Sequence, residues 1–264
     1  ICDSRYPQLS SLSGATYRRQ LSPLYRADPG SLASAVSDTK PPGQGNRLGS
    51  PLYFRAAEKT SFRGLHSGVK VACEEMNMTP EEALEVLAKY RGDAIVITTM
   101  AAVGIWPRFS DQPRDFAYMP SAMGQGPALG LGLALAQPQH RVIVVCGDGS
   151  LLMNLGCLVT IANYPAPLFL VLMDNGMYEV TGGQPIVGSR TIDFGRIAEG
   201  AGIKRVYHFR EKGEWEDQAQ RCLELPGPVF IWLEIAGRTG QKTPQPPRAM
   251  PEQIRRLQIA LGVN

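Results

Sequence analysis

The sequence lacks the patterns that mark several large classes of protein. No apolar run approaches the roughly 20 residues of a membrane-spanning helix, and the N-terminus has no basic segment followed by an apolar run. The five cysteines include no Cys-x-x-Cys pair. We therefore expect a cytoplasmic protein with reduced, buried thiols and no membrane association.

Charge of one sign is not in large excess, but it is unevenly distributed. Residues 1–75 carry 10 Lys and Arg against 6 Asp and Glu, whereas residues 76–264 carry 17 against 18. The basic residues form neither a stripe nor a platform with aromatic residues, so we expect no nucleic-acid partner. The hydrophobic share of 44% is that of an ordinary globular protein.

Residues 1–75 show no sustained helical or strand period. Ser, Pro, Gly and Arg dominate there, and such a composition buries too little apolar surface to offset the entropy of ordering. No Met precedes Met76, and folded-looking sequence begins at Thr79. We interpret residues 1–75 as an irregular extension that is either a disordered native tail or not part of the native protein. We predict a domain over residues 76–240, then a Pro-rich linker and a terminal helix over residues 241–264.

From residue 79 onward, helical patterns alternate with short apolar runs. The runs that we predict as strands are 94–99, 116–119, 142–146, 168–173, 206–209 and 228–235. The predicted helices include 79–90, a Gly/Ala-rich one ending at 136, 194–201, 215–223 and 251–261. This alternation is typical of an α/β fold, a doubly wound and mainly parallel sheet with helices on both faces.

Two of these strands are followed by oxygen-bearing side chains, Asp148 and Asn175. Ligands of open parallel sheets bind beyond the carboxyl ends of the strands. A carboxylate and an amide oxygen suit a hard cation such as Mg²⁺, whose shell phosphate oxygens usually complete. Gly147 and Gly149 allow the backbone to approach a diphosphate closely, and Ser150 opens a helix whose N-terminus favours an anion.

Two other interpretations compete for the Gly-Asp-Gly run. By itself the run is typical of a surface turn. A dinucleotide-binding loop would need a third glycine where Leu152 stands, and an acidic residue near position 168 that is absent. The strand signals on both sides, with Asn175 following the second strand, favour the diphosphate and metal site.

The run Gly147-Asp148-Gly149, the 24 residues that follow, and Asp174-Asn175 together resemble the motif of enzymes that depend on thiamine diphosphate (ThDP). Many members have Asn-Asn where this chain has Asp174-Asn175. The resemblance implies that Mg²⁺ is bound by the side chains of Asp148 and Asn175 and by the main-chain carbonyl of Met177. It places the glycines of the motif and Ser150 at the cofactor, with Gly149 and Ser150 meeting the diphosphate.

A second segment, Ser121-Ala122-Met123-Gly124, resembles the part of this family that grips the aminopyrimidine ring. The resemblance makes Met123 an apolar wedge that holds the cofactor bent, and gives main-chain bonds to the ring from Ser121 and Met123. Thr99, at the end of the first strand, resembles a turn that contacts the diphosphate. The plainer interpretations are core filling for Met123 and a strand-end hydroxyl for Thr99.

Residues 179–185 read as a Gly-hinged loop over the cofactor. Glu179 is a tempting acid–base group there, although a solvated loop carboxylate is the plainer interpretation. His66, His140 and His208 lie outside every motif, and we expect them to be non-catalytic. The sequence assigns no catalytic residue.

More specifically, residues 79–236 resemble the β subunits of sulfopyruvate decarboxylase and the matching part of phosphonopyruvate decarboxylase. The resemblance implies a ThDP- and Mg²⁺-dependent decarboxylase, a carbon–carbon lyase acting on a small 2-oxo acid. It also implies a hetero-oligomer, because a partner subunit must supply the pyrimidine-binding domain and its glutamate. The loop from Met100 to Gly104 departs from the Gly and Ser/Arg/Glu pattern expected there. The alternatives are an acetolactate-synthase-like carboligase or oxidoreductase subunit of the same family, and a non-catalytic ThDP-binding or purely structural subunit.

Overall fold

The computed structural model describes residues 78–189 and 191–263. The predictions for residues 1–75, for a translation start at Met76, and for His66 lie outside the described residues. Within them, the centre of the molecule is one sheet of six strands, and each neighbouring pair is parallel. The strands are β1 Ile95–Thr98, β2 Asp115–Ala117, β3 Val142–Gly147, β4 Leu168–Asp174, β7 Val206–Phe209 and β8 Val229–Glu234. Their order is β2-β1-β3-β4-β8-β7.

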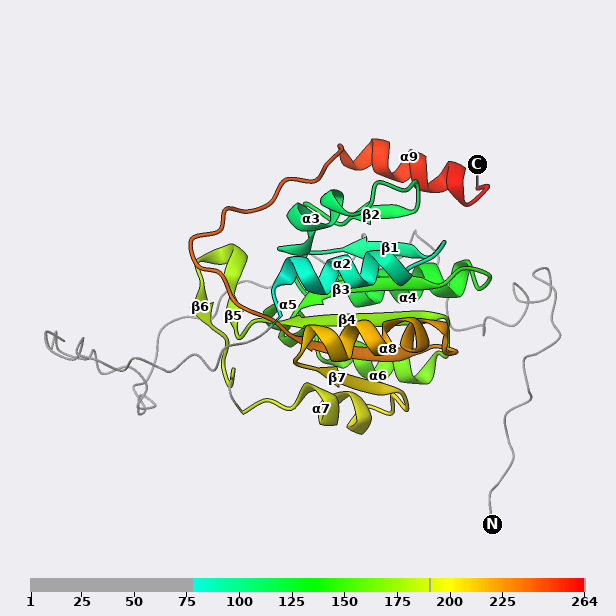
Figure 1. Ribbon diagram of the computed structural model, residues 1–264. Coiled ribbons are helices and arrows are strands. Elements are labelled where there is room, and N and C mark those ends of the chain that lie inside the picture. Colours follow the sequence, from blue (N-terminus) through cyan, green and yellow to red (C-terminus); the bar gives the residue numbers. More distant parts are fainter. Residues whose placement is uncertain (1–77, 190, 264) are drawn as a thin grey trace, which may run out of the picture. The chain divides into compact units, whose positions relative to one another are not determined.

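Helices cover both faces of this sheet (Figure 1). The first face packs on α2 Pro80–Tyr90, α3 Ala102–Ile105 and α8 Lys212–Glu224. The second packs on α4 Gly126–Ala136, α5 Asp148–Leu152, α6 Gly156–Asn163 and α7 Phe194–Gly200. Because both faces are covered, β1, β3 and β4 read as continuous apolar runs rather than as alternating ones. The predicted doubly wound α/β fold is confirmed.

Helix α2 begins where its sequence predicts. Thr79 caps it: the Thr79 hydroxyl accepts a hydrogen bond from the Glu82 backbone N–H, and the Glu82 carboxylate accepts one from the Thr79 backbone N–H. Its apolar side faces α8, whose Trp215 is fully buried and donates its indole N–H to the Ala83 carbonyl at 3.1 Å. The helix is thus fixed at one end by its cap and along one side by packing.

Five short elements were not predicted. The stretch after β1 forms α3 and a 3₁₀ turn, η2 Trp106–Arg108. The segment predicted as a hinged loop folds into a small antiparallel hairpin of β5 Met177–Tyr178 and β6 Gln184–Pro185 around η3 Glu179–Thr181. Elements of two to four residues have no measurable period, so a periodicity analysis misses them.

The terminal helix, α9 Met250–Ala260, covers the β2 edge of the sheet (Figure 1). Gln253 is buried, and its side-chain oxygen accepts a hydrogen bond from the Ala117 backbone N–H at 2.7 Å. Asp111 pairs with Arg248 at 2.6 Å and with Arg256 at 3.1 Å. One strand edge is therefore satisfied by a side chain and held by exposed ion pairs.

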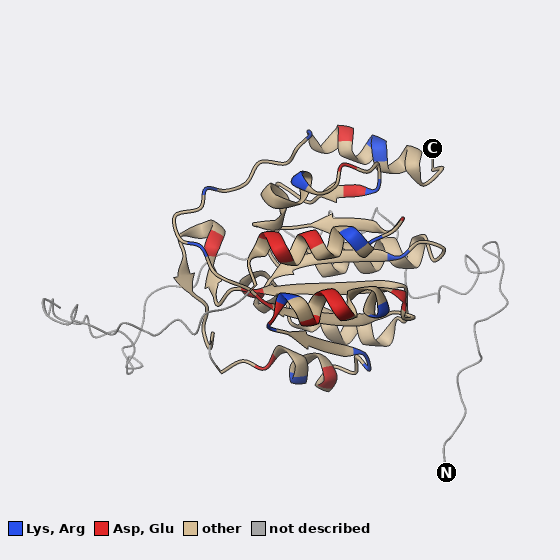
Figure 2. Ribbon diagram, in the orientation of Figure 1, with Lys and Arg blue, Asp and Glu red and all other residues tan. Residues whose placement is uncertain are grey.

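Charge is absent from two neighbouring helices, α4 and α6, whereas α2 and α8 carry many charges (Figure 2). Between Asp115 and Asp174 the sequence contains only two charged residues, Arg141 and Asp148. Exposed apolar side chains on or beside these helices are Leu135, Met153, Val159 and Tyr164. In the described part of the chain, no helix combines the length and the apolarity needed to cross a bilayer.

Candidate functional site

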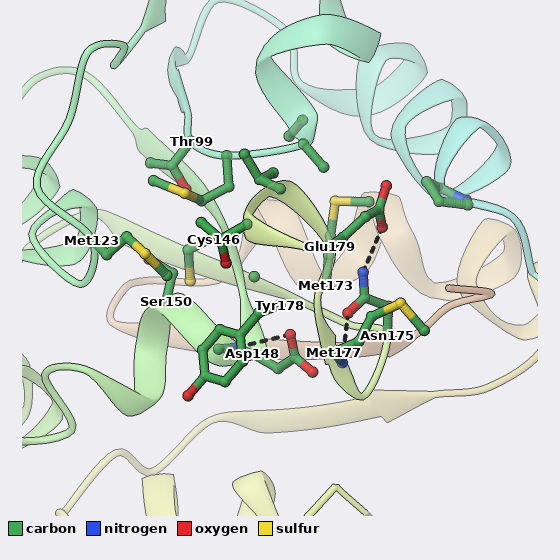
Figure 3. Close-up of a pocket in the computed structure, with 18 of the residues that line it drawn as sticks. Thr99, Met123, Cys146, Asp148, Ser150, Met173, Asn175, Met177, Tyr178 and Glu179 are labelled. Carbon is green, nitrogen blue, oxygen red and sulfur yellow. Dashed lines mark hydrogen bonds between the residues drawn. The ribbon is translucent and has the colours of Figure 1, made fainter. Parts of the chain in front are cut away.

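Three neighbouring strands, β1, β3 and β4, bring the predicted site residues to one edge of the sheet. In the register, Gly147 lies opposite Met173 and Thr98 lies opposite Val145. The residues that follow these strand ends line a single pocket (Figure 3). Of the nine site residues named from the sequence, eight line it: Thr99, Met123, Gly147, Asp148, Gly149, Ser150, Asn175 and Met177.

Ser121 is the ninth residue and does not line the pocket. It lies two residues before Met123, and its buried hydroxyl has no hydrogen-bond partner. The segment is joined to the next motif through Gly124, whose N–H donates to the Ser150 hydroxyl oxygen at 3.0 Å. The two predicted motifs therefore meet directly, although they are 26 residues apart in sequence.

Asp148 is a buried carboxylate, 2% exposed, without a cationic partner among the described residues. Its Oδ1 accepts from its neighbour Gly149, and its Oδ2 accepts from Gly176 at 2.7 Å. Burial raises the pKa of Asp148 well above the usual range, and the nearby Asp174 raises it further. Two carboxylates that share a buried site create a demand for positive charge.

The helix after Asp148 differs slightly from the prediction. It begins at Asp148, with Gly147 as the capping residue, rather than at Ser150. A side chain at Gly149 would place its first carbon 2.6 Å from the Tyr178 ring. The absence of a side chain at Gly149 is thus required by the hairpin, since this strand end and the β5–β6 hairpin are in close contact.

Thr99 and Ser150 offer hydroxyl groups to the same pocket. The Thr99 hydroxyl donates to the Val145 carbonyl at 3.0 Å, which agrees with the strand-end role weighed for it. Ser150 accepts from Gly124, so its own proton stays available for an acceptor in the pocket. Between these two residues, Ser150 has the better-placed donor.

Asn175 and Glu179 interact, which the sequence did not predict. The Asn175 amide Nδ2 donates to Glu179 Oε2 at 2.6 Å, and Asn175 Oδ1 accepts from the Met177 N–H at 3.0 Å. The interpretation of Glu179 as a solvated loop carboxylate is wrong, because the residue is only 5% exposed and lines the pocket. The sequence does not reveal this burial, because it depends on Arg238, 59 residues later, whose Nε lies 3.4 Å from Glu179 Oε1.

The described wall of the pocket carries two carboxylates, Asp148 and Glu179, and contains no Lys, Arg or His. Its remaining lining is largely apolar, including Met100, Ala101 and Met123. Met100 has a φ of 50°, a left-handed conformation that few non-glycine residues adopt. A strained residue beside a pocket is a feature that often accompanies function.

His208 lies outside this pocket. Its Nε2 is 2.7 Å from Glu234 Oε1, and its ring stacks on Trp232 with centroids 3.8 Å apart. Trp232 in turn donates to Asp174 Oδ2 at 2.9 Å. These contacts give His208 a role in packing the sheet next to the site.

The donor set fits a hard divalent cation. Asp148 supplies one charged oxygen, Asn175 a neutral oxygen, and Met177 lies on the same wall. No group of three or more His, Cys, Asp or Glu in the described residues could hold a metal by itself. A cation at this place therefore needs further anionic oxygens, such as those of a diphosphate.

Comparison with known proteins gives an independent assignment. Residues 98–233 match the family described as "Thiamine pyrophosphate enzyme, C-terminal TPP binding domain". The chain is 46% identical over 126 residues to the sulfopyruvate decarboxylase subunit beta of Methanothermobacter thermautotrophicus, across 47% of this chain and 64% of that subunit. It is 36% identical over 155 residues to the phosphonopyruvate decarboxylase of Streptomyces viridochromogenes, across 58% of this chain and 38% of that enzyme. The chain thus spans less than two thirds of either relative.

A solved structure shows the same fold. Benzoylformate decarboxylase from Polynucleobacter necessarius superposes with a TM-score of 0.53 at 19% identity, over 63% of this chain and 34% of that one. The sheet and its covering helices are therefore shared with a much longer chain.

Proposed function

The chain belongs to the thiamine pyrophosphate enzymes, whose C-terminal TPP-binding domain it carries, and from this premise we propose that it is one subunit of a ThDP- and Mg²⁺-dependent decarboxylase of small 2-oxo acids. One observation carries the proposal: eight residues predicted from separate motifs line a single pocket at adjacent strand ends. Both named relatives are decarboxylases of such acids.

In this proposal each end of the pocket holds a different part of the cofactor. Asp148, Asn175 and the Met177 carbonyl hold Mg²⁺, while Gly149 and Ser150 meet the diphosphate, to which the Ser150 hydroxyl donates a hydrogen bond. Gly147 keeps the backbone close to the diphosphate, and Thr99 lies beside it. When bound, ThDP supplies an electron sink for the pair left on the carbonyl carbon as carbon dioxide departs.

Met123 and Ser121 act at the other end of the cofactor. Met123 packs against it from the pocket wall, and the Ser121 segment lines the approach to the ring. The β5–β6 hairpin adds Tyr178 beside the strand ends and excludes water from that side. These residues bind, orient and desolvate, which is the contribution that a protein makes to cofactor chemistry.

We further propose a partner subunit that brings the pyrimidine-binding domain. The relative from Methanothermobacter is named a subunit, and the described part of this chain contains a single sheet besides the small hairpin. Helices α4 and α6 present an uncharged outer side with exposed Leu135 and Val159. Large uncharged apolar areas on a surface are typical of protein interfaces.

Asp148→Asn tests the proposed function. We expect the substitution to weaken Mg²⁺-dependent ThDP binding by more than roughly a hundredfold. Loss of a residue that only hydrogen-bonds to a metal ligand already lowers metal affinity by about 10–100-fold, and Asp148 is proposed as a ligand itself. Calorimetry of the chain with its partner, ThDP and Mg²⁺ measures this. The fold should persist, because the change removes the charge from one of two neighbouring carboxylates.

The control is Asp217→Asn, an exposed carboxylate on α8 outside the pocket, which should bind as the unmodified chain does. Equal binding by Asp148→Asn would contradict the metal assignment. Product analysis then decides the reaction class: an aldehyde and carbon dioxide support the decarboxylase, and a condensed hydroxy-ketone supports the carboligase.

A further inference from the structure

We propose that Glu179 is a positioning residue that fixes the orientation of the Asn175 carboxamide for the metal, and that Arg238 holds Glu179 in place. This inference rests on the proposed function, because it concerns the same metal site. No motif in the sequence assigns either Glu179 or Arg238 a role.

The first support is the short contact between the two side chains. Glu179 Oε2 accepts a hydrogen bond from Asn175 Nδ2 at 2.6 Å, drawn as a dashed line in Figure 3. Both residues line the pocket, and Glu179 is nearly inaccessible to solvent. A hydrogen bond to a carboxylate away from water is stronger than one between neutral groups.

The second support is that this contact permits one orientation of the amide only. An ionised carboxylate accepts hydrogen bonds and donates none. The Asn175 NH₂ group must therefore face Glu179, because the flipped amide would set its oxygen against the carboxylate. Asn175 Oδ1 then points to the other side, where it meets the Met177 N–H and keeps a lone pair for a cation.

The third support is the way in which Glu179 is itself held. Arg238 lies with Nε 3.4 Å from Glu179 Oε1 and with a terminal nitrogen 2.7 Å from Glu81 at the start of α2. The adjacent Gly237 packs against the turn that carries Asn175: a side-chain carbon at Gly237 would be 3.1 Å from the Asn175 carbonyl oxygen. The segment after β8 therefore brings a counter-charge to a buried carboxylate that would otherwise be costly.

A hydrogen-bond partner behind a metal ligand typically changes metal affinity when it is removed. Substitution of Glu179 by Gln keeps the shape but lets either end of the new amide face Asn175, so the preference is weakened. Substitution by Leu removes the acceptor. We expect the Mg²⁺ concentration for half-maximal ThDP binding to rise about tenfold in Glu179→Gln and up to roughly a hundredfold in Glu179→Leu.

The experiment titrates Mg²⁺ at fixed ThDP, by calorimetry on the full chain together with its partner subunit. Thermal unfolding of the metal-free protein is recorded in parallel. Excess Mg²⁺ should restore ThDP binding to both variants, because the ligands themselves remain. Glu199→Gln, an exposed position on α7, is the matched control and should leave the Mg²⁺ midpoint unchanged.

Several outcomes would overturn the inference. A lower unfolding temperature with an unchanged Mg²⁺ midpoint would make Glu179 a purely structural residue. Normal binding of both ligands with loss of turnover would make it a catalytic residue instead. If Glu179→Gln does not fold, Arg238→Gln is measured instead. The inference then requires the Mg²⁺ midpoint to rise, by less than the tenfold expected for Glu179→Gln. Absence of Mg²⁺ dependence in the unmodified chain would overturn the proposed function as well, so the two failures can be told apart.

Discussion

One residue at a strand end, Asp174, differs from the usual ThDP motif, and its contacts show what the difference does. Asp174 stands where many members of the family have Asn, and its carboxylate accepts from Trp232 and from the Gly176 N–H at 3.1 Å. An acid at this position anchors the loop that carries Asn175. It also adds negative charge next to Asp148, and so strengthens the demand for a cation.

The glycines of α4 provide a residue-scale test of packing. A side-chain carbon at Gly130 would overlap Val144 on β3, whereas Gly132, two residues later, has open space around it. We expect Gly130→Ala to reduce the free energy of unfolding by about 1–3 kcal/mol. Gly132→Ala should raise it by roughly 0.5–1 kcal/mol, because alanine loses less backbone entropy in a helix. Denaturant unfolding of both variants measures the pair, and equal effects would contradict the close approach of α4 to the sheet.

At the scale of elements, the sequence predicts the strands and helices that have a hydrophobic period. It does not predict the features that depend on contacts between residues far apart in the chain. The six strands and the longer helices followed from buried apolar runs and from the Thr79 cap, with ends shifted by a few residues at most. The order of strands and polar residues in the sequence predicts that Asp148 and Asn175 lie close together, and both line the pocket. The burial of Glu179 depends on Arg238 and Gly237, which pack onto the hairpin from after β8, and no local pattern encodes that contact.

Helix α9 provides the pH-dependent prediction. Hydrogen bonds from Arg248 and Arg256 lower the pKa of Asp111 to about 2. Because the folded-state pKa is depressed, the stabilisation is complete above the ordinary value near 4 and is lost as the pH falls towards 2. These pairs are exposed, so the contribution is below about 1 kcal/mol.

Asp111→Asn should therefore lower the unfolding temperature slightly at pH 5–7, and the difference from the unmodified chain should vanish towards pH 2. Thermal unfolding across this range measures it, with Asp217→Asn as an exposed control at a position without an ion pair to any described residue. A difference that grows on acidification would show that the ion pairs do not hold α9.

At the scale of the whole molecule, the proposed function makes the described residues one half of a site that two chains share. We propose that the described pocket wall binds the metal and the diphosphate, and that the wall facing the pyrimidine ring comes from another chain. We expect the chain alone to release no carbon dioxide from 2-oxo acids, and mixing with the partner subunit to restore activity in proportion to the complex formed. Carbon dioxide release measured against partner concentration tests this. Turnover by the lone chain would contradict the split-site proposal.

The acidic character of the pocket wall has a consequence for how selectivity evolves. With Asp148 and Glu179 and no Lys, Arg or His on the described wall, this chain offers no cationic side chain there to a second acidic group of a substrate. In the proposed split site, the cationic side chains that recognise a doubly charged acid come from the partner subunit. Exchange of the proposed partner subunit would then change the substrate selectivity of the enzyme, while the cofactor-binding residues of this chain stayed the same.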